Sequence, residues 1–425
     1  MNILIKIKRV LSKFRRLDWV IEHAVNVFLG RPDEKWNFYH FDRKVHKKTW
    51  EKHDEILKWA DYCTNNAGKF EKLELYEKSN DPIVKKGYYL IEKIKKEFKN
   101  KYNDSALRIL IHVPSPIISP AGFSLFSNLL QGLCFIGIKA KSLNWDQPIE
   151  DHLQSFKPNF FITSDDEPYL TRINWEAVTN YRKHSELKLG LTASLEEHGN
   201  TPLTGRLKWA KAKKVDFYYC FEDQKYIRER KEYCLFFEEE YQIISIPFGT
   251  NPLIYYPIPD IKKDLNYVFI GSKTMDKFPR FSYWEGILSK TPGFISGTGW
   301  TISGSNFKFN QERNRYIFAR AKVGLNLHLN LQMNWACELN ERTYTLAACG
   351  VPQLIDKPKI LPERFTNDCF FVGESPEEYE QLFYYILNNS EEANNRALKA
   401  QKEVFSKHTI FHRAEDFVKA LELLG

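Results

Sequence analysis

Short apolar runs alternate with amphipathic segments from about residue 106 onward, and this pattern predicts strands and helices in turn. Buried strands are expected at residues 107–113, 138–143, 160–163, 187–192, 217–220 and 242–246. Segments with helical spacing separate them, near residues 123–135, 150–156, 173–184, 203–213 and 224–232. Alternating strands and helices are typical of a parallel sheet with helices on its faces. We therefore expect a Rossmann-like domain over residues 106–250.

The alternation begins again after a proline-rich stretch, which predicts an extended linker over residues 251–262. Further strands are expected at residues 267–271, 293–299, 323–327, 351–356 and 369–372, with helices near 279–289, 310–321 and 341–349. They predict a second Rossmann-like domain over residues 263–405, followed by a terminal helix at 406–425. The fold class is thus α/β, with two doubly wound parallel-sheet domains facing a cleft. Open sheets of this kind bind ligands at the carboxyl ends of their strands.

All of the excess positive charge lies in a helical amino-terminal region, residues 1–105. This region holds 24 Lys and Arg against 16 Asp and Glu, whereas the other residues balance at 38 against 38. Residues 1–22 form an amphipathic pattern, with six Lys or Arg and no acid in the first sixteen positions. Such a helix can dock on an anionic membrane surface. The alternative is a helix packed on the protein with a solvated basic face.

The composition favours a cytoplasmic protein that could lie peripherally on the inner face of the membrane. Seven cysteines show no CxxC pair and no zinc spacing, so we expect reduced, buried thiols. No apolar stretch approaches the length of a membrane span, and no cleavable signal is apparent. Acidic residues are interleaved with the many lysines of residues 31–105, which argues against a nucleic-acid partner.

Residues 340–356 combine a helix start with an arginine and a glycine stop. Asn340 is a good N-cap, and Gly350 suits the position just past the helix end. Amides of the first turn, including that of Thr343, then face outward at the positive end of the helix dipole and can bind a phosphate. Arg342 in this turn could hold a diphosphate through two N–H groups. We interpret this segment as the nucleotide end of a sugar-transferring enzyme.

A second phosphate-binding segment opens the second domain. The strand at residues 267–271 runs into Gly271 and Ser272, where backbone can approach a phosphate closely. Three cations follow before the next helix: Lys273, Lys277 and Arg280. Each charge-assisted contact to a leaving diphosphate is worth roughly 1.5–3 kcal/mol. We predict Arg342 and Lys277 as catalytic residues, because they would stabilise the charge that develops on the diphosphate.

The chain shows no motif that calls for a metal or another cofactor. No Asp-x-Asp pair stands at a strand end, and the nearest acidic group, residues 165–167, is placed to favour a helix dipole. The sequence after Gly271 is not a P-loop. We therefore expect metal-independent transfer, with a nucleoside-diphosphate sugar as donor substrate and no cofactor.

Three further residues are candidates for contacts with the sugars. His198 follows the strand that ends near residue 192, and its imidazole could act as a base or bond a hydroxyl. His328 has the same position after a strand of the second domain, and Gly122 ends a proline-rich loop that could lie over a sugar. Polar surface or a plain turn is the alternative at each position. His408 and His412 are expected to be structural.

Several of these motifs together resemble the group 1 glycosyltransferases of the CgeB-like, spore-maturation branch. The resemblance rests on Asn340-x-Arg342-x-Tyr344, on residues 348–352, on His408-Thr409-x-x-His412-Arg413, and on residues 247–252 and 267–272. It spans about residues 240–420. It implies the GT-B arrangement, a nucleotide-sugar donor held by the carboxy-terminal domain, no essential metal, and a terminal helix that packs back on the amino-terminal domain.

One position departs from the wider family. A Glu-x7-Glu pair usually holds the donor, but Thr345 stands at the second position and Cys337 at the first, beside Glu338. Thr345 can still bond a ribose hydroxyl. The sequence thus predicts a glycosyltransferase that moves a sugar to a saccharide or lipid-linked acceptor in surface-glycan synthesis. A non-catalytic glycan-binding or coat-assembly protein and a nucleotide-sugar isomerase are the alternatives.

Overall fold

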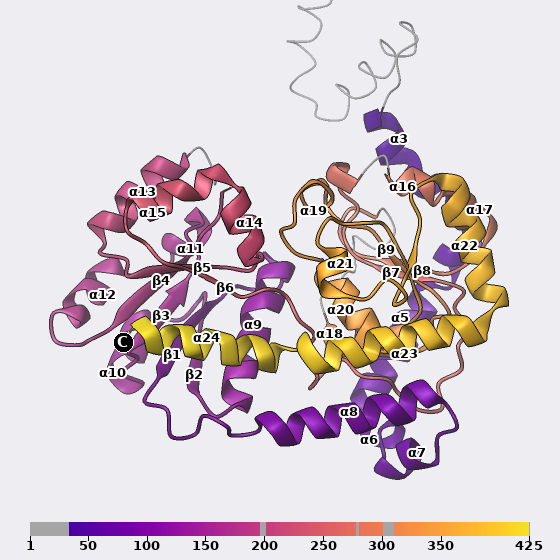
Figure 1. The fold of residues 1–425 in the computed structure, drawn as a ribbon, viewed down its shortest axis with the longest axis horizontal. Coiled ribbons are helices and arrows are strands. Elements are labelled where there is room, and N and C mark those ends of the chain that lie inside the picture. Colours follow the sequence, from indigo (N-terminus) through magenta and orange to yellow (C-terminus); the bar gives the residue numbers. More distant parts are fainter. Residues whose placement is uncertain (1–33, 196–200, 278–279, 301–309, 425) are drawn as a thin grey trace, which may run out of the picture.

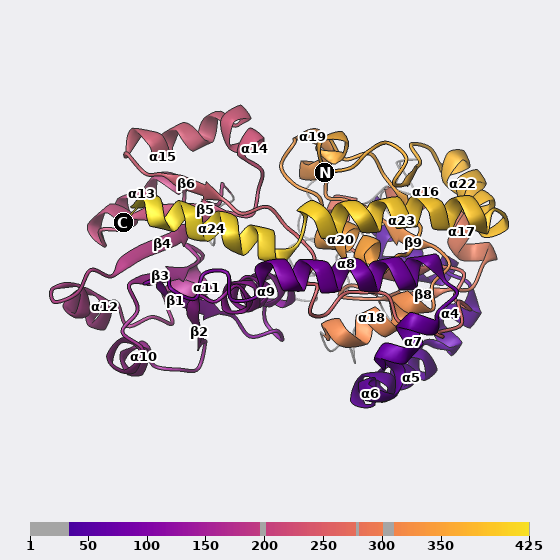
Figure 2. The same ribbon diagram turned by 60° about the horizontal axis from the view of Figure 1, so that its bottom comes forward.

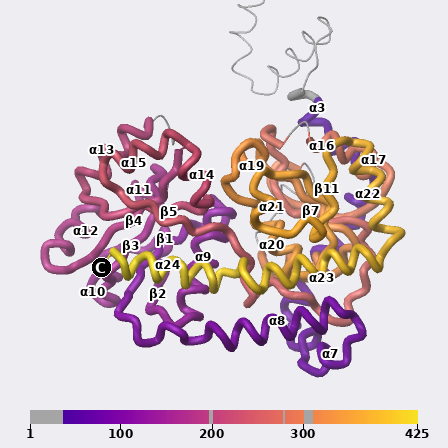
Figure 3. The backbone as a smooth tube through the Cα atoms, in the orientation of Figure 1, coloured from indigo at the N-terminus to yellow at the C-terminus, as the bar shows by residue number. Residues whose placement is uncertain are grey.

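A computed structural model describes residues 34–195, 201–277, 280–300 and 310–424. Two α/β domains lie side by side, and the carboxy-terminal helices run across both of them (Figures 1 and 3). Each domain contains one parallel sheet. The expected architecture of two Rossmann-like domains with amino-terminal helices is therefore confirmed.

The amino-terminal domain is built on six parallel strands in the order β2-β1-β3-β4-β5-β6. The strands are β1 (Arg108–Val113), β2 (Lys139–Asn144), β3 (Phe160–Thr163), β4 (Lys188–Thr192), β5 (Phe217–Cys220) and β6 (Ile243–Ser245). The helices between them are α9 (Pro120–Phe135), α10 (Ile149–Ser155), α11 (Glu167–Leu170), α12 (Trp175–Arg182), α13 (Leu203–Ala212), α14 (Gln224–Glu229), η2 (Lys231–Tyr233) and α15 (Cys234–Glu238). All six strands lie within one residue of where the apolar runs predict them.

The carboxy-terminal domain has five parallel strands in the order β11-β10-β9-β7-β8. They are β7 (Val268–Ile270), β8 (Phe294–Ser296), β9 (Gly324–Asn326), β10 (Gln353–Ile355) and β11 (Phe371–Val372). Its helices are η3 (Met275–Lys277), α16 (Arg280–Tyr283), α17 (Glu285–Lys290), α18 (Gln311–Ala319), α19 (Asn330–Asn334), α20 (Glu341–Ala348), α21 (Leu361–Arg364) and α22 (Pro376–Asn388). The linker before β7 contains neither helix nor strand.

Both sheets are buried on both faces, as the near-continuous apolar strands require. In β1, Ile109 and Ile111 join one hydrophobic cluster while Leu110 joins another on the opposite face. In β7, Val268 and Phe269 divide in the same way between two clusters of the second domain. Successive side chains of a strand point to opposite faces, so each sheet forms the middle of a three-layer sandwich.

The amino-terminal helices pack on the second domain rather than forming a separate unit. They are α3 (Glu34–His40), η1 (Phe41–Lys44), α4 (Lys47–Glu51), α5 (His53–Asn65), α6 (Ala67–Phe70), α7 (Leu73–Lys78) and α8 (Pro82–Phe98). Helix α5 packs on α18, and α8 runs beside α23 (Ser390–Lys407) (Figure 2). Residues 1–22, for which a membrane contact is expected, lie outside the described residues.

Three long helices connect the domains. Residues of α8 enter the core clusters of both domains, with Ile91 in one and Phe98 in the other. Helix α24 (Ile410–Leu424) follows α23 and packs against α9 of the amino-terminal domain (Figure 1). Within the described residues, no helix is both long and apolar enough to cross a bilayer.

Candidate functional site

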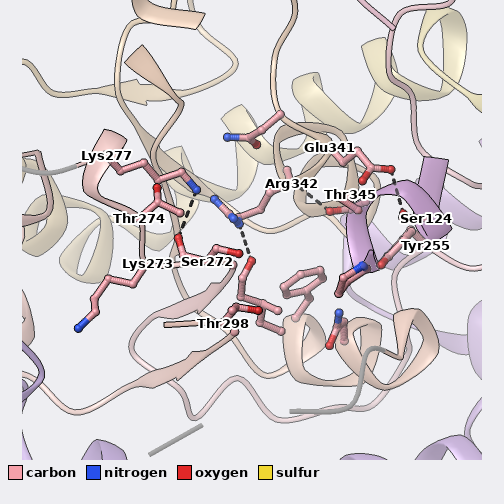
Figure 4. A pocket seen from close by; sticks show the side chains of 18 residues that line it. Ser124, Tyr255, Ser272, Lys273, Thr274, Lys277, Thr298, Glu341, Arg342 and Thr345 are labelled. Carbon is pink, nitrogen blue, oxygen red and sulfur yellow. Dashed lines mark hydrogen bonds between the residues drawn. The ribbon is translucent and has the colours of Figure 1, made fainter. Parts of the chain in front are cut away.

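A cavity of about 440 Å³ lies between the two domains, where the carboxyl ends of the strands of the second sheet face α9 (Figure 4). The amino-terminal domain contributes Pro120, Ala121 and Ser124. The remaining lining comes from the linker and the second domain: Tyr255, Ile270, Gly271, Ser272, Lys273, Thr274, Lys277, Gly297, Thr298, Asn314, Phe318, Asn340, Glu341, Arg342 and Thr345. The cavity therefore requires both domains.

The turn after β7 allows Arg342 to lie directly against the backbone. A Cβ added to Gly271 would stand 1.8 Å from Nη2 of Arg342, so a larger residue there would displace the guanidinium from this position. Gly297, with φ +136°, packs on the backbone of Gly271, since a Cβ there would lie 2.4 Å from the Gly271 carbonyl oxygen. The Gly271 amide donates to Ser296 O at 2.8 Å. Gly271 thus makes room for the guanidinium, and Gly297 lets the turn after β8 pack on Gly271.

Arg342 is oriented by neutral partners and keeps its charge available. Its Nε donates to Ile270 O at 2.7 Å and its Nη1 to Asn326 Oδ1 at 3.1 Å. The guanidinium lies over the Phe269 ring, 4.4 Å from the centroid. No carboxylate among the described residues is within ion-pairing distance, and Nη2 has no hydrogen bond to them. Burial lowers the pKa of Arg342 to about 10, partly offset by the charge of Asp356, so the group remains a cation.

Helix α20 presents backbone donors beside this guanidinium. Asn340 is the N-cap, as predicted, and its Oδ1 accepts from the Thr343 amide at 3.1 Å. Its Nδ2 donates to Asn326 Oδ1 at 2.9 Å and to Leu327 O at 3.0 Å, which fixes the helix start. The amides of Glu341 and Arg342 have no acceptor among the described residues. Two outward N–H groups at a helix start form an anion site.

Lys277 supplies a second cation, and no carboxylate of the described residues pairs with it. The side chain is 7% exposed, and Nζ is 3.4 Å from the carbonyl oxygen of Ser272. Burial, reinforced by the charge of Arg342, lowers the pKa of Lys277 to about 7, while Asp356 and Asp276 oppose this shift. Nearby, the buried Thr274 hydroxyl has no hydrogen-bond partner within the described residues. A bound anion would satisfy these groups together.

Residues 286–419 match the protein family described as Glycosyl transferase-like. The matched segment contains α20 with Arg342 and ends within α24. An alpha-glucosyltransferase in complex with UDP and a 13-mer DNA containing a central A:G mismatch aligns with a TM-score of 0.50 at 11% identity, over 75% of this chain and 100% of that chain. The protein has the GT-B fold.

Two further solved structures align over 75% of this chain at 12% identity, each with a TM-score of 0.48. One is sucrose-phosphate synthase from Thermosynechococcus elongatus, covered over 99% of its length. The other is Anabaena Alr3699/HepE in complex with UDP-glucose, covered over 100%. No curated protein matches the chain. The resemblance to the CgeB-like branch stays a prediction.

Two of the four predicted diphosphate-binding cations are directed elsewhere in this GT-B fold. The ammonium of Lys273 points away from the cavity (Figure 4) and pairs with Asp42 at 2.6 Å. Arg280 donates to Asn330 Oδ1 at 2.5 Å and to His328 O at 2.6 Å, so it braces the start of α19. In this structure the Lys273 ammonium and the Arg280 guanidinium are thus bound to other groups. A contact of these two residues with the donor stays a prediction.

Other predicted residues have structural partners too. His328 is fully buried, with Nδ1 2.6 Å from Asp356 Oδ1 and Nε2 3.2 Å from the Thr343 hydroxyl, so it cannot contact a sugar. Thr343 uses both its amide and its hydroxyl within this network. Gly122 packs under Tyr169 and Ser119 and does not itself line the cavity.

The remaining predicted residues divide as follows. Gly271, Ser272 and Thr345 line the cavity, and the Thr345 hydroxyl donates to Arg342 O at 3.3 Å. His198 lies outside the described residues. Glu338, next to the absent acidic pair, bonds Arg364 and Tyr344 in the core and does not line the cavity.

Sequence reasoning missed Glu341 and Ser124, which come from different domains and meet at one side of the cavity. The Ser124 hydroxyl donates to Glu341 Oε1 at 3.0 Å. Glu341 directly precedes Arg342, and this position beside a predicted site residue was the signal that could have identified it. Ser124 has no such signal, because only the packing of the two domains against each other brings α9 to α20.

Proposed function

We propose that the protein is a GT-B glycosyltransferase that moves a sugar from a nucleoside-diphosphate donor to an acceptor hydroxyl. The observation that carries this proposal is the Arg342 guanidinium. It is held by neutral partners, lacks an ion pair to the described residues, and lines the interdomain cavity beside two outward amides. Arginine binds phosphate oxygens through two N–H groups, so this geometry suits a diphosphate.

The donor diphosphate would lie between Arg342 and Lys277, against the turn at Gly271 and Ser272. The amides of Glu341 and Arg342 would complete the cradle, and the Thr345 hydroxyl would bond the ribose. As the glycosidic bond breaks, negative charge grows on the leaving diphosphate. Preorganised cations and amides stabilise that charge without reorganising, a role that a metal fills in other transferases. The presence of these cations and amides favours transfer without a metal.

The acceptor would enter against the amino-terminal domain, which contributes Pro120, Ala121 and Ser124 to the cavity. A saccharide or lipid-linked acceptor of surface-glycan synthesis remains our proposal, and so does the cytoplasmic location. Closure of the two domains over the donor would exclude water, whose attack on the donor competes with transfer.

A ligand screen tests this function directly. Thermal shifts with UDP-, GDP-, ADP-, CMP- and dTDP-sugars are expected to show stabilisation by at least one donor, followed by release of its diphosphate. Conversion of the sugar nucleotide without diphosphate release would indicate an isomerase. Absence of stabilisation by every donor would contradict the proposal and favour a non-catalytic role.

Nucleoside-diphosphate affinity is expected to fall as pH rises above 7. In the protein without ligand, Lys277 has a pKa of about 7. A bound diphosphate would favour the charged form of Lys277, so above pH 7 the complex must take up a proton as it forms. Calorimetry in buffers of different ionisation heat measures this uptake. Lys277→Met is expected to bind UDP roughly 10- to 100-fold more weakly at pH 6.5, because about 1.5–3 kcal/mol of charge-assisted bonding is lost.

The same variant should lose the pH dependence of binding between pH 7 and 9. Lys262→Met, at an exposed lysine of the linker, is the matched control and should behave as wild type. A pH slope that persists in Lys277→Met would show that another group takes up the proton.

Membrane docking through residues 1–22 is expected to be separable from donor chemistry. Deleting these residues should abolish flotation with anionic vesicles, since up to about 1 kcal/mol per basic residue is lost near such a surface. Donor hydrolysis by the shortened protein should be unchanged. Equal flotation of both proteins would refute the anchor.

A further inference from the structure

Glu341 stands on the opposite wall of the cavity from the two cations. It is the first residue of α20, and its carboxylate reaches across to α9, where Ser124 Oγ donates to it at 3.0 Å. Figure 4 shows Glu341 and Ser124 on one side, and Lys277 with the Arg342 guanidinium on the other. Two adjacent residues of one helix thus present a base and a cation to opposite ends of a single cavity.

A chain of buried amides holds this carboxylate in place. Asn251 Nδ2 donates to Asn128 Oδ1 at 2.9 Å, and Asn128 Nδ2 donates to Ser124 Oγ at 3.3 Å. Asn251, Asn128 and Ser124 are all at most 6% exposed. Each group donates toward Glu341, so the network orients the carboxylate as an acceptor. It also links the interdomain linker to the cavity.

No cation among the described residues neutralises Glu341. Arg342 turns its guanidinium to Ile270 O, and Lys277 lies across the cavity. From α24, Arg413 adjoins Glu341 at a cavity of about 30 Å³, but its donors go to Phe248 O, Lys407 O and His408 Nδ1. Tyr255 from the linker is the remaining ionisable neighbour and is neutral near pH 7, because burial raises its pKa well above 10.

This environment makes Glu341 a proton acceptor near neutral pH. Burial raises the pKa of Glu341 to about 7, although hydrogen bonds from Ser124 and Asn128 favour its charged form. A general base works best when its pKa lies close to the working pH. A carboxylate that served only as an ion-pair partner would have a lowered pKa instead.

We propose that Glu341 is the general base that removes the proton from the acceptor hydroxyl, with Ser124 and Asn128 as positioning residues. The acceptor oxygen forms a bond to the anomeric carbon while its proton moves to a carboxylate oxygen of Glu341. The bond from that carbon to the diphosphate oxygen breaks, and its electron pair leaves with the nucleoside diphosphate. This inference rests on the proposed transferase function.

The geometry adds a stereochemical consequence. The base and the diphosphate-binding cations lie on opposite sides of the cavity, so the acceptor would attack from the face away from the leaving group. The product is then expected to have the inverted anomeric configuration, which product NMR identifies. A retained configuration would contradict this role for Glu341.

The test compares Glu341→Gln, Ser124→Ala and the control Glu312→Gln, whose side chain is exposed in the first turn of α18. The substrate is the nucleotide sugar that stabilises wild type most in the donor screen, with water and a panel of methyl glycosides as acceptors. Diphosphate release is followed from pH 5.5 to 9. Wild type should show an ascending limb near pH 7.

Glu341→Gln should lower kcat at least 100-fold and lose this limb, while its Kd for the nucleoside diphosphate changes less than threefold. Ser124→Ala should retain more activity, with the limb shifted to higher pH, because the carboxylate loses a donor. Glu312→Gln should match wild type. Wild-type kcat in Glu341→Gln, or a loss confined to donor affinity, would overturn the assignment.

A second readout needs no substrate. The folded protein holds the Glu341 proton more tightly than the unfolded chain, so wild type should lose Tm relative to Glu341→Gln as pH rises from 5 to 7. A Tm difference that is independent of pH would contradict titration of Glu341. If wild type binds no nucleotide sugar, the proposed function itself fails. If it binds donor but releases no diphosphate, only the catalytic assignment falls.

Discussion

Arg342→Ala is expected to lower turnover by about 10²- to 10³-fold, the cost of removing one preorganised donor from a developing anion. The guanidinium is fixed by Ile270 O and Asn326, and its Nη2 lies against Gly271, which also lines the cavity. The substitution removes both the positive charge and the pair of N–H groups with which a guanidinium binds phosphate oxygens. Single-turnover release of diphosphate measures the effect without a contribution from product dissociation.

Two variants sharpen this prediction. Arg342→Lys keeps a charge but not the planar fork, so it should recover only part of the lost rate. Arg320→Ala is the matched control, because Arg320 pairs with Asp264 of the same domain and does not line the cavity. Wild-type turnover in a folded Arg342→Ala protein would remove this residue from the mechanism.

Asp42→Ala is expected to destabilise the protein by about 3–5 kcal/mol, since it leaves the Lys273 ammonium buried without its partner. The two side chains are 7% and 2% exposed, with their charged atoms 2.6 Å apart. Lys273 Nζ also donates to Phe38 O at 3.2 Å and lies 5.4 Å from the centroid of the Trp300 ring. The first unfolding transition in urea measures the loss.

The exposed pair Lys44–Glu285 provides the control for this variant. Its charged atoms are 2.8 Å apart, but both side chains are more than 40% exposed. Glu285→Gln should therefore change stability by less than about 1 kcal/mol. Equal effects of the two substitutions would show that burial of the Asp42–Lys273 pair does not matter to the fold.

The strands and helices of the two domains could be predicted from the sequence, because the local pattern of hydrophobic residues determines them. Strands such as β3 and β5 are short apolar runs between turn residues, and a parallel sheet buried on both faces admits little else. Asn340 could likewise be assigned as a helix cap, since a cap depends on residues only a few positions away.

Side-chain direction could not be predicted in the same way. Lys273, Lys277 and Arg280 look equivalent in the sequence. Of these three, only Lys277 turns to the cavity and has no carboxylate partner in the part of the chain that the structure describes. Lys273 is drawn away by Asp42, more than two hundred residues earlier in the chain. The contact between Glu341 and Ser124 depends equally on how the two domains meet. The sequence thus predicted where the site lies and that Arg342 belongs to it. It did not predict all of the side chains that line it.

The central claim is that a nucleoside diphosphate binds in the interdomain cavity against Arg342. A crystal structure of the full chain with UDP, or with the nucleotide preferred in the donor screen, tests it most directly. The account predicts phosphate oxygens within hydrogen-bond distance of the Arg342 guanidinium and of the amides of Glu341 and Arg342. A nucleotide bound elsewhere, with the Arg342 guanidinium unchanged and uncontacted, would contradict it.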